Sequence, residues 1–205
     1  VRLVGSEMCI RDRDNTDDII GKLLNVFNEY GPEVVFESNF YKVLTGRNLL
    51  TKDYATFTDH EELNDGVSLF ISIGGDGTML RAATYVRGKN IPIVGINAGR
   101  LGFLATVQQE NIETLLPLIF TNEYKISPRT LLTLKYEGSD EQLEGLDFAL
   151  NEITVSRRDT TSMITVDVKL NGDHLNSYWA DGLILSTPTG LSLIHISEPT
   201  RRTPI

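Results

Sequence analysis

The chain has 205 residues, with 19 basic and 28 acidic side chains and a formal net charge of −9. This acidic balance argues against a nucleic-acid-binding surface, and no run of about 20 apolar residues offers a membrane span. The single cysteine, Cys9, excludes a disulfide framework and a cysteine-based zinc site, which fits a cytoplasmic location.

The two ends of the chain are related at the DNA level. Residues 3–13 and 191–201 can be encoded as reverse complements of each other, and the shared sequence looks like a transposase adapter used in DNA library preparation. The two ends of one protein have no physical reason to be related in this way. We therefore expect 1–13 and 191–205 to be adapter-derived, non-native and outside the fold.

Residues 14–107 alternate helical and strand patterns. A helix is expected first, because apolar residues recur on one face of 14–30. Strands alternating with helices predict a mostly parallel sheet between helical layers, that is, a three-layer α/β domain. In chain order the pattern predicts a helix at 14–30, a strand at 33–37, a short helix at 39–44, a strand at 67–73, a helix at 78–87 and a strand at 91–96.

The pattern changes in residues 108–190. An amphipathic helix is expected over 108–120, although Pro117 makes its second half less certain. After Tyr124 apolar residues alternate with a period of two, and Asn171-Gly172-Asp173 is typical of a hairpin turn. This part therefore predicts a connecting helix and a truncated antiparallel all-β domain. Its expected strands are 131–136, 148–155, 164–170 and 183–186.

The most informative segment is the glycine-rich turn of residues 74–78, which follows an apolar strand and precedes a helix. Glycines without a Cβ allow the backbone to approach a ligand closely. The N–H groups of the turn and of the helix N-terminus attract anions, above all phosphate. Asp76 is a poor choice for holding phosphate but a good one for accepting a proton from a hydroxyl or holding a metal. The alternative is an N-cap Asp in an ordinary turn.

Three further segments carry polar residues at strand ends. Residues 95–104 form a second glycine-rich strand exit, which is either an ordinary loop or the wall of a crevice at the carboxyl ends of parallel strands. Asn151-Glu152 lies within an apolar strand, where it needs partners or faces water at a sheet edge. Residues 181–190 are a strand between Asp-Gly and Thr-Pro-Thr-Gly, the alternative being a hairpin strand with turn residues at both ends.

Together these four segments resemble the NAD kinase family, and the resemblance covers nearly all of 14–190. Diacylglycerol and sphingosine kinases and phosphofructokinases carry turns similar to the first segment, whereas the other three are specific to NAD kinases. The motifs stand as Gly74-Gly75-Asp76-Gly77-Thr78; Gly95-Ile96-Asn97, Gly99 and Leu101-Gly102-Phe103-Leu104; Asn151-Glu152; and Asp181-Gly182 with Ser186-Thr187-Pro188-Thr189-Gly190.

The resemblance implies transfer of a phosphoryl group from ATP, or from polyphosphate, to the 2′-hydroxyl of the adenosine ribose of NAD. It also implies assistance by Mg²⁺ or a similar divalent cation, whose ligands stay unassigned. Asp76 is the implied catalytic base. The implied NAD-binding residues are Asp76, Gly77, Arg81, Phe103, Asn151, Glu152, Asp181 and Thr189, and the implied phosphate-binding residues are Gly74, Gly75, Gly77 and Thr78.

Because they act on one ribose, we expect Asp76, the 95–102 loop, Asn151-Glu152 and Asp181 to line one crevice. For Arg81 the alternative is an exposed helix residue, and for Phe103 it is a core residue. The resemblance also implies a homo-oligomer, a dimer or tetramer, with small-molecule substrates and neither nucleic acid nor membrane as partners.

The chain departs from the family pattern in several places. Ser162 and Trp179 stand where other members place a basic or His ligand. Leu191-Ser192-Leu193-Ile194 replaces a Ser-Thr-Ala-Tyr-like segment, and the family's first strand is expected to be missing. We therefore expect the parent protein to be an NAD kinase and the chain as it stands to be inactive. Two alternatives stay open: a diacylglycerol- or sphingosine-type lipid kinase, and a non-catalytic nucleotide-binding module.

Overall fold

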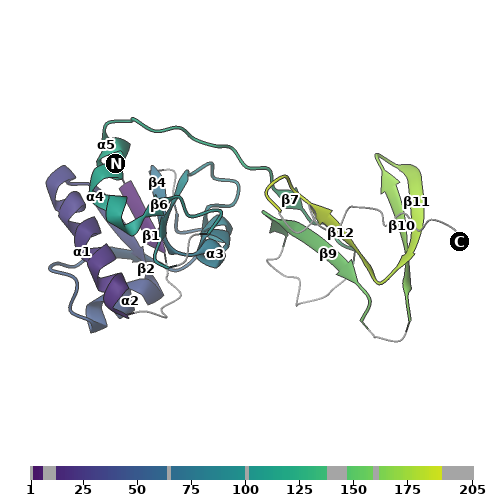
Figure 1. Cartoon of the computed structure of the whole chain (residues 1–205), viewed down its shortest axis with the longest axis horizontal. Helices are drawn as coiled ribbons and strands as arrows, with labels where there is room; N and C mark the ends of the chain where they lie inside the picture. Colours follow the sequence, from purple (N-terminus) through teal and green to yellow (C-terminus); the bar gives the residue numbers. More distant parts are fainter. Residues whose placement is uncertain are drawn as a thin grey trace, which may run out of the picture. The chain divides into compact units, whose positions relative to one another are not determined.

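The computed structural model describes residues 2–6, 13–63, 66–99, 102–137, 147–158 and 162–190. The chain divides into two compact units, Val1–Ile126 and Ser127–Ile205. In the first unit parallel strands alternate with helices, and in the second the strands pair antiparallel (Figure 1). The predicted fold class is confirmed.

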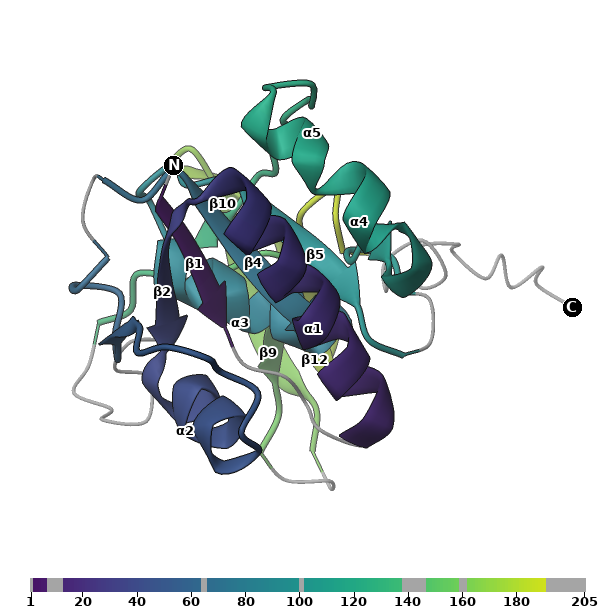
Figure 2. The same ribbon diagram turned by 90° about the vertical axis from the view of Figure 1, so that its left-hand side faces the viewer.

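The first unit is built on a six-stranded sheet with the order β3-β2-β1-β4-β5-β6. Neighbouring strands in this sheet all run parallel. Helices cover both faces, and Figure 2 shows α1 in front of the sheet and α3 behind it. The strands are β1 Arg2–Ser6, β2 Glu33–Glu37, β3 Ala55–Phe57, β4 Leu69–Gly74, β5 Ile93–Asn97 and β6 Val107–Gln108, and the longer helices are α1 Arg13–Tyr30, α2 Ser38–Gly46 and α3 Asp76–Val86.

Strand β4 is buried along its whole length, because it lies between the two helical layers. Successive side chains of a strand point to opposite faces. Accordingly Ile71 and Ile73 belong to the core beneath α1, whereas Phe70 belongs to the core beneath α3. The glycine turn that follows β4 therefore leaves the sheet near its centre, on a strand held from both sides.

Residues 109–120 form three short segments instead of one helix: η1 Gln109–Asn111, α4 Ile112–Leu115 and α5 Pro117–Phe120. The break falls at Pro117, which begins a new helix because it has no N–H to continue the old one. Ile112 and Leu116 are buried in the core beneath α1. The sequence pattern placed this segment in the second part, residues 108–190. In the structure it packs within the first unit.

The N-terminal residues have a place in the fold, contrary to prediction. Strand β1 pairs with β2 on one side and with β4 on the other, and Leu3 is almost fully buried. The family's first strand was expected to be missing, but β1 occupies a central position in the sheet. The expectation that 1–13 lie outside the fold is therefore wrong for residues 2–6 and for Arg13, which begins α1. Residues 1, 7–12 and 191–205 lie outside the described residues, and the adapter origin of both ends stays a prediction.

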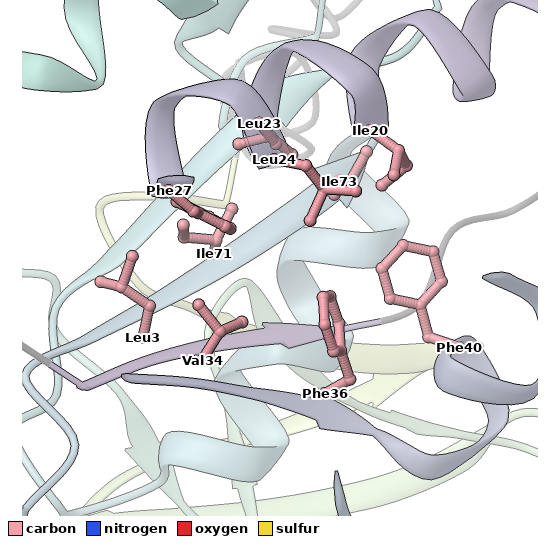
Figure 3. A pocket seen from close by; sticks show the side chains of 10 residues that line it. All are labelled: Leu3, Ile20, Leu23, Leu24, Phe27, Val34, Phe36, Phe40, Ile71 and Ile73. Atoms are coloured by element: carbon pink, nitrogen blue, oxygen red, sulfur yellow. The ribbon is translucent and has the colours of Figure 1, made fainter. Parts of the chain in front are cut away.

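A wholly apolar cavity lies between α1 and the sheet (Figure 3). Its lining comes from α1, from the strands β1, β2 and β4, and from Phe40 on α2. With no polar group in its lining, the cavity does not suit a nucleotide. Its lining residues are Leu3, Ile20, Leu23, Leu24, Phe27, Val34, Phe36, Phe40, Ile71 and Ile73.

In the described part of the second unit, the strands form three antiparallel pairs. The predicted hairpin turn is confirmed, with Asn171 and Gly172 both at positive φ between β10 and β11. The single strand predicted over 148–155 is wrong, because the backbone leaves the ladder at Leu150-Asn151. The pairs are β7 Leu132–Thr133 with β8 Phe148–Ala149, β9 Glu152–Ser156 with β12 Gly182–Ser186, and β10 Ile164–Leu170 with β11 Asp173–Ala180.

Candidate active site

The glycine turn is shaped by its closest contacts. Gly74 has φ 149°, and a Cβ at this position would lie 2.3 Å from Oγ1 of Thr78. Gly75 precedes α3 without a side-chain cap, so no side chain occupies the N-terminal N–H groups of the helix at that position. The turn therefore presents backbone donors at the positive end of α3, which is the arrangement that binds phosphate.

The carboxylate of Asp76, the first residue of α3, contacts the second glycine-rich loop. Its Oδ2 accepts a hydrogen bond from the N–H of Phe103 at 3.0 Å, and its Oδ1 accepts one from Leu104 at 2.9 Å. Burial raises the pKa of the Asp76 carboxyl, but hydrogen bonds from the N–H groups of residues 103–105 outweigh this and hold the pKa below its usual value. Asp76 is thus an ionised hydrogen-bond acceptor and a weak base.

The second loop begins beside the first because β4 and β5 end together. Gly74 and Asn97 are register partners, and the N–H of Ala98 donates to the carbonyl of Gly74 at 3.4 Å. The side-chain Oδ1 of Asn97 accepts from the N–H of Gly99 at 3.0 Å. The structure thus brings the two glycine-rich segments into contact at the carboxyl ends of adjacent parallel strands, where α/β sheets bind ligands.

Two buried polar atoms near these strand ends have no hydrogen-bond partner among the described residues. They are Oγ of Ser72, on β4, and Nδ2 of Asn97, on β5. The register places both residues on the sheet face that carries α3. Buried polar groups are normally satisfied, so these atoms mark a place for a water molecule or a ligand atom. The sequence named the segment that contains Asn97 but not this side chain.

The other predicted residues of the first unit are solvent-accessible. Phe103 is 51% exposed, so the alternative of a core Phe is wrong. Arg81 and Gly77 are also exposed on α3. Phe103 thus carries an exposed aromatic ring on the residue whose N–H binds the Asp76 carboxylate, and such a ring offers a flat apolar surface that suits a heterocyclic base.

In the second unit, pairing of β9 with β12 brings two of the motifs together. Ser186 is the register partner of Glu152, and the N–H of Thr187 donates to the carbonyl of Asn151 at 2.8 Å. Gly190 is needed here, because a Cβ would lie 2.7 Å from the carbonyl oxygen of Asn151 and 3.1 Å from Oε2 of Glu152. The Asn151-Glu152 pair and the Thr-Pro-Thr-Gly segment therefore form one cluster.

Thr189 is buried in this cluster and held by two contacts. Its N–H donates to Oγ1 of Thr187 at 3.1 Å, and its own Oγ1 accepts from Nη1 of Arg129 at 3.4 Å. Arg129 was not singled out from the sequence, since it lies in a stretch without periodic pattern. The side chain that supports Thr189 could be found only from the fold.

Asp181 lies at the opposite end of the same strand pair. It precedes Gly182, the partner of Ser156, and stands five positions before Ser186, about 17 Å along a strand. Its Oδ1 forms an ion pair with Nη1 of Arg157 at 3.2 Å, and the side chain stays exposed. The structure therefore does not join Asp181 to the Asn151-Glu152 cluster. The departures Ser162 and Trp179 are exposed, Trp179 by 75%.

The described residues hold no group of three or more His, Cys, Asp or Glu side chains placed to bind a metal ion. Among the described residues, no helix is both long and apolar enough to span a membrane.

Comparison with known proteins identifies the family. Residues 24–124 match the ATP-NAD kinase N-terminal domain, and 150–194 match the ATP-NAD kinase C-terminal domain. The NAD kinase of Flavobacterium psychrophilum is 54% identical over 178 residues, which are 87% of this chain and 60% of that protein. The NAD kinase of Bacteroides fragilis is 40% identical over 175 residues, 85% of this chain and 59% of that protein. The chain spans about 60% of the length of these relatives.

Two solved structures share the fold. Yeast NADH kinase complexed with NADH has a TM-score of 0.72 at 19% identity, covering 96% of this chain and 60% of its own. An NAD kinase from Archaeoglobus fulgidus in complex with ATP has a TM-score of 0.57 at 24% identity, covering 91% of this chain and 60% of its own. Since both domain models come from one family and together match most of the sequence, the chain belongs to the ATP-NAD kinase family.

Proposed function

We propose that the protein is an NAD kinase that transfers a phosphoryl group from ATP to the 2′-hydroxyl of the adenosine ribose of NAD. The observation that carries the proposal is the Asp76 carboxylate at the first turn of α3, within a glycine turn that presents backbone donors, in a chain of this family. The complex of the Archaeoglobus relative with ATP supports ATP as the donor. Polyphosphate is the second candidate donor.

The glycine turn binds the phosphates in this proposal. We assign this binding to Gly74, Gly75, Gly77 and Thr78. Gly74 is buried and lets the backbone turn closely past Thr78, and Gly75 leaves the backbone partly exposed before α3. Gly77 and the buried Thr78 belong to the first turn of α3. Phosphoryl transfer depends mainly on positioning and on neutralising charge, and oriented N–H groups at a helix N-terminus supply both.

Asp76 accepts the hydrogen bond, and then the proton, of the attacking hydroxyl. A carboxylate has about four acceptor positions, so the loop N–H groups leave room for a substrate hydroxyl. The lowered pKa of Asp76 makes it a weak base. That is sufficient where the transition state is loose and the proton leaves the nucleophile late.

The second unit supplies contacts to NAD. We assign Asn151, Glu152 and Thr189 to the adenosine part, because they cluster at one end of the β9–β12 pair. Asp181, about 17 Å away along the strand, contacts the other half of the dinucleotide. Two polar points at this separation suit an extended molecule better than a single ribose. Arg81 and Phe103 complete the proposed NAD contacts from the first unit.

A divalent cation, Mg²⁺ in the first place, fits as a companion of the ATP phosphates and not as a resident ion. The described residues offer no three-ligand cluster, but Mg²⁺ commonly needs only one or two protein carboxylates beside phosphate oxygens. It supplies charge neutralisation when bound. We further propose a cytoplasmic location and a homo-oligomer. Size-exclusion chromatography with light-scattering detection checks the oligomeric state.

The test is NADP⁺ formation from NAD⁺, ATP and Mg²⁺. It is run with the 205-residue chain and, in parallel, with the gene product read from uninterrupted genomic DNA across both ends. We expect NADP⁺ from the genomic product. A product that phosphorylates diacylglycerol or sphingosine but not NAD⁺ contradicts the proposal, and a product that binds ATP with no transfer to any acceptor supports the non-catalytic alternative.

A further inference from the structure

The two glycine-rich segments meet at one side chain. The Asp76 carboxylate accepts hydrogen bonds from consecutive N–H groups, those of Phe103 and Leu104, at 3.0 and 2.9 Å. Asp76 is fixed at the start of α3, whose N-terminus follows directly from the central strand β4. The loop that carries Phe103 is thereby tied to a rigid element through a carboxylate.

Gly102 shows how closely the loop approaches. A Cβ at position 102 would lie 2.3 Å from Oδ1 of Asp76 and 2.7 Å from its Cγ. Even alanine at this position displaces the carboxylate from the loop. By contrast, a Cβ at Gly99, in the same loop, would meet no atom within 4 Å. The close fit is thus specific to the contact with Asp76.

The charge of Asp76 matters as much as its shape. Both carboxylate oxygens accept N–H bonds from the loop. An asparagine of the same shape keeps one acceptor oxygen but places an NH₂ group against the second N–H donor. Only the ionised carboxylate therefore satisfies both donors, and charge-assisted bonds of this kind are stronger than neutral ones.

We propose that Asp76 is, beyond its contact with the hydroxyl, the positioning residue that holds the Gly102–Leu104 loop against the glycine turn. We call these hydrogen bonds from Phe103 and Leu104 to the Asp76 carboxylate the latch. The latch fixes the position of Phe103, so a dinucleotide base bound at Phe103 keeps a fixed position relative to the phosphoryl donor at the turn. This deepens the proposed function and rests on it. It predicts that the position of the loop and the binding of NAD change together when the latch is broken.

Three variants separate the latch from the chemistry. Asp76→Asn removes the charge and the base. Gly102→Ala keeps the carboxylate and pushes it off the loop. Gly99→Ala is the matched control, a Gly-to-Ala change in the same loop at a position with open space. The first readout is amide hydrogen exchange of residues 103 and 104 in the 205-residue chain, with exchange of β4 as the check that each variant is folded.

We expect Asp76→Asn and Gly102→Ala each to speed exchange at 103 and 104 by about tenfold or more, because each breaks charge-assisted hydrogen bonds. Gly99→Ala and the β4 amides stay as in the wild type. Unchanged exchange at 103 and 104 in Gly102→Ala, with β4 still protected, overturns the latch.

The second readout is the split between KM for NAD⁺ and kcat in the active genomic product. Gly102→Ala should raise KM about tenfold with a smaller loss in kcat, since the base is still present. Asp76→Asn should both raise KM for NAD⁺ and lower kcat. A normal KM in Gly102→Ala overturns the link between the latch and NAD binding. If the amides of 103 and 104 exchange faster as expected, but neither the wild type nor any variant forms NADP⁺, the proposed function fails and the latch stands.

Discussion

The two units of this chain differ in how many apolar side chains they bury. Among the described residues, the buried apolar side chains all lie in the first unit, where two cores cover both faces of one sheet. The buried polar residues of the second unit are Thr187 and Thr189, while Leu170, Leu175 and Trp179 are exposed. Isolated two-stranded pairs are marginal in water, so the first unit has a stability of its own that the second lacks.

The comparison also concerns function. The first unit presents backbone donors and one carboxylate at the ends of buried strands, which is a fixed frame for chemistry. The second unit presents amides, hydroxyls and carboxylates at the ends of a strand pair whose side chains are half-buried or exposed. We expect changes in the first unit to affect folding and turnover, and changes in the second to affect substrate binding.

The largest expected effect is on the core of the first unit. Phe70 is fully buried and packs against Phe57 and Tyr85 at ring-centroid distances of 6.2 and 6.0 Å. Phe70→Ala should lower the free energy of unfolding by about 3–5 kcal/mol. Leu185→Ala, at a residue of the second unit that is 45% exposed, should cost about 1 kcal/mol or less. Chemical denaturation measures both, and equal costs would remove the distinction between the units.

The next effect separates turnover from binding in the active genomic product. Asp76→Asn should lower kcat by about 10²–10⁴-fold, because the acceptor of the hydroxyl proton is lost. Glu152→Gln should mainly weaken NAD binding, by about 1.5–3 kcal/mol for a lost charge-assisted hydrogen bond. Initial rates with NAD⁺ and ATP both varied distinguish the two. Near-normal kcat in Asp76→Asn would remove the role of Asp76 as the acceptor of the hydroxyl proton.

A smaller effect tests the turn that connects the sheet to α3. Gly74→Ala should destabilise the chain by about 1–3 kcal/mol, since φ is positive and the new Cβ meets Thr78. Gly75→Ala is the control, because its Cβ would meet nothing within 4 Å. Thermal unfolding of the two variants should differ. If Gly74→Ala unfolds like Gly75→Ala, the close approach of Thr78 is not required.

Acid should weaken the Asp76 latch. Because the folded pKa of Asp76 lies below its usual 3.8, the carboxylate stabilises the fold above that value and loses this contribution as the pH falls through the folded pKa. The dependence of unfolding free energy on pH below about 3.8 should therefore be shallower in Asp76→Asn than in the wild type. Identical profiles would show that the loop contact adds no stability.

The smallest effect concerns a glycine inside α1. Gly21→Ala should stabilise the first unit by about 0.5–1 kcal/mol, because alanine is favoured over glycine in a helix interior and the new Cβ would meet no atom within 4 Å. Chemical denaturation measures the change. A destabilised Gly21→Ala chain would contradict the open space around this position.

Local patterns in the sequence were enough to predict most helices and strands of the first unit and the turns that carry polar groups. The helix α1, the strands β2, β4 and β5 and the hairpin at Asn171-Gly172 follow from periodicity and turn chemistry within a few residues, and the structure confirms them. The glycine turn with Asp76 was found in the same way. Such features depend on neighbours along the chain, which the sequence shows directly.

Features that depend on contacts between residues far apart in the sequence appeared only in the folded chain. It placed residues 2–6 in the middle of the sheet, because Leu3 finds apolar neighbours on β2 and β4. It broke the strand at Leu150-Asn151, whose carbonyls accept from Thr187. It also turned the Asp76 carboxylate onto the loop at 103–104 and set Asp181 apart from Glu152. Each of these depends on which groups meet across the fold, and spacing along the chain does not encode that.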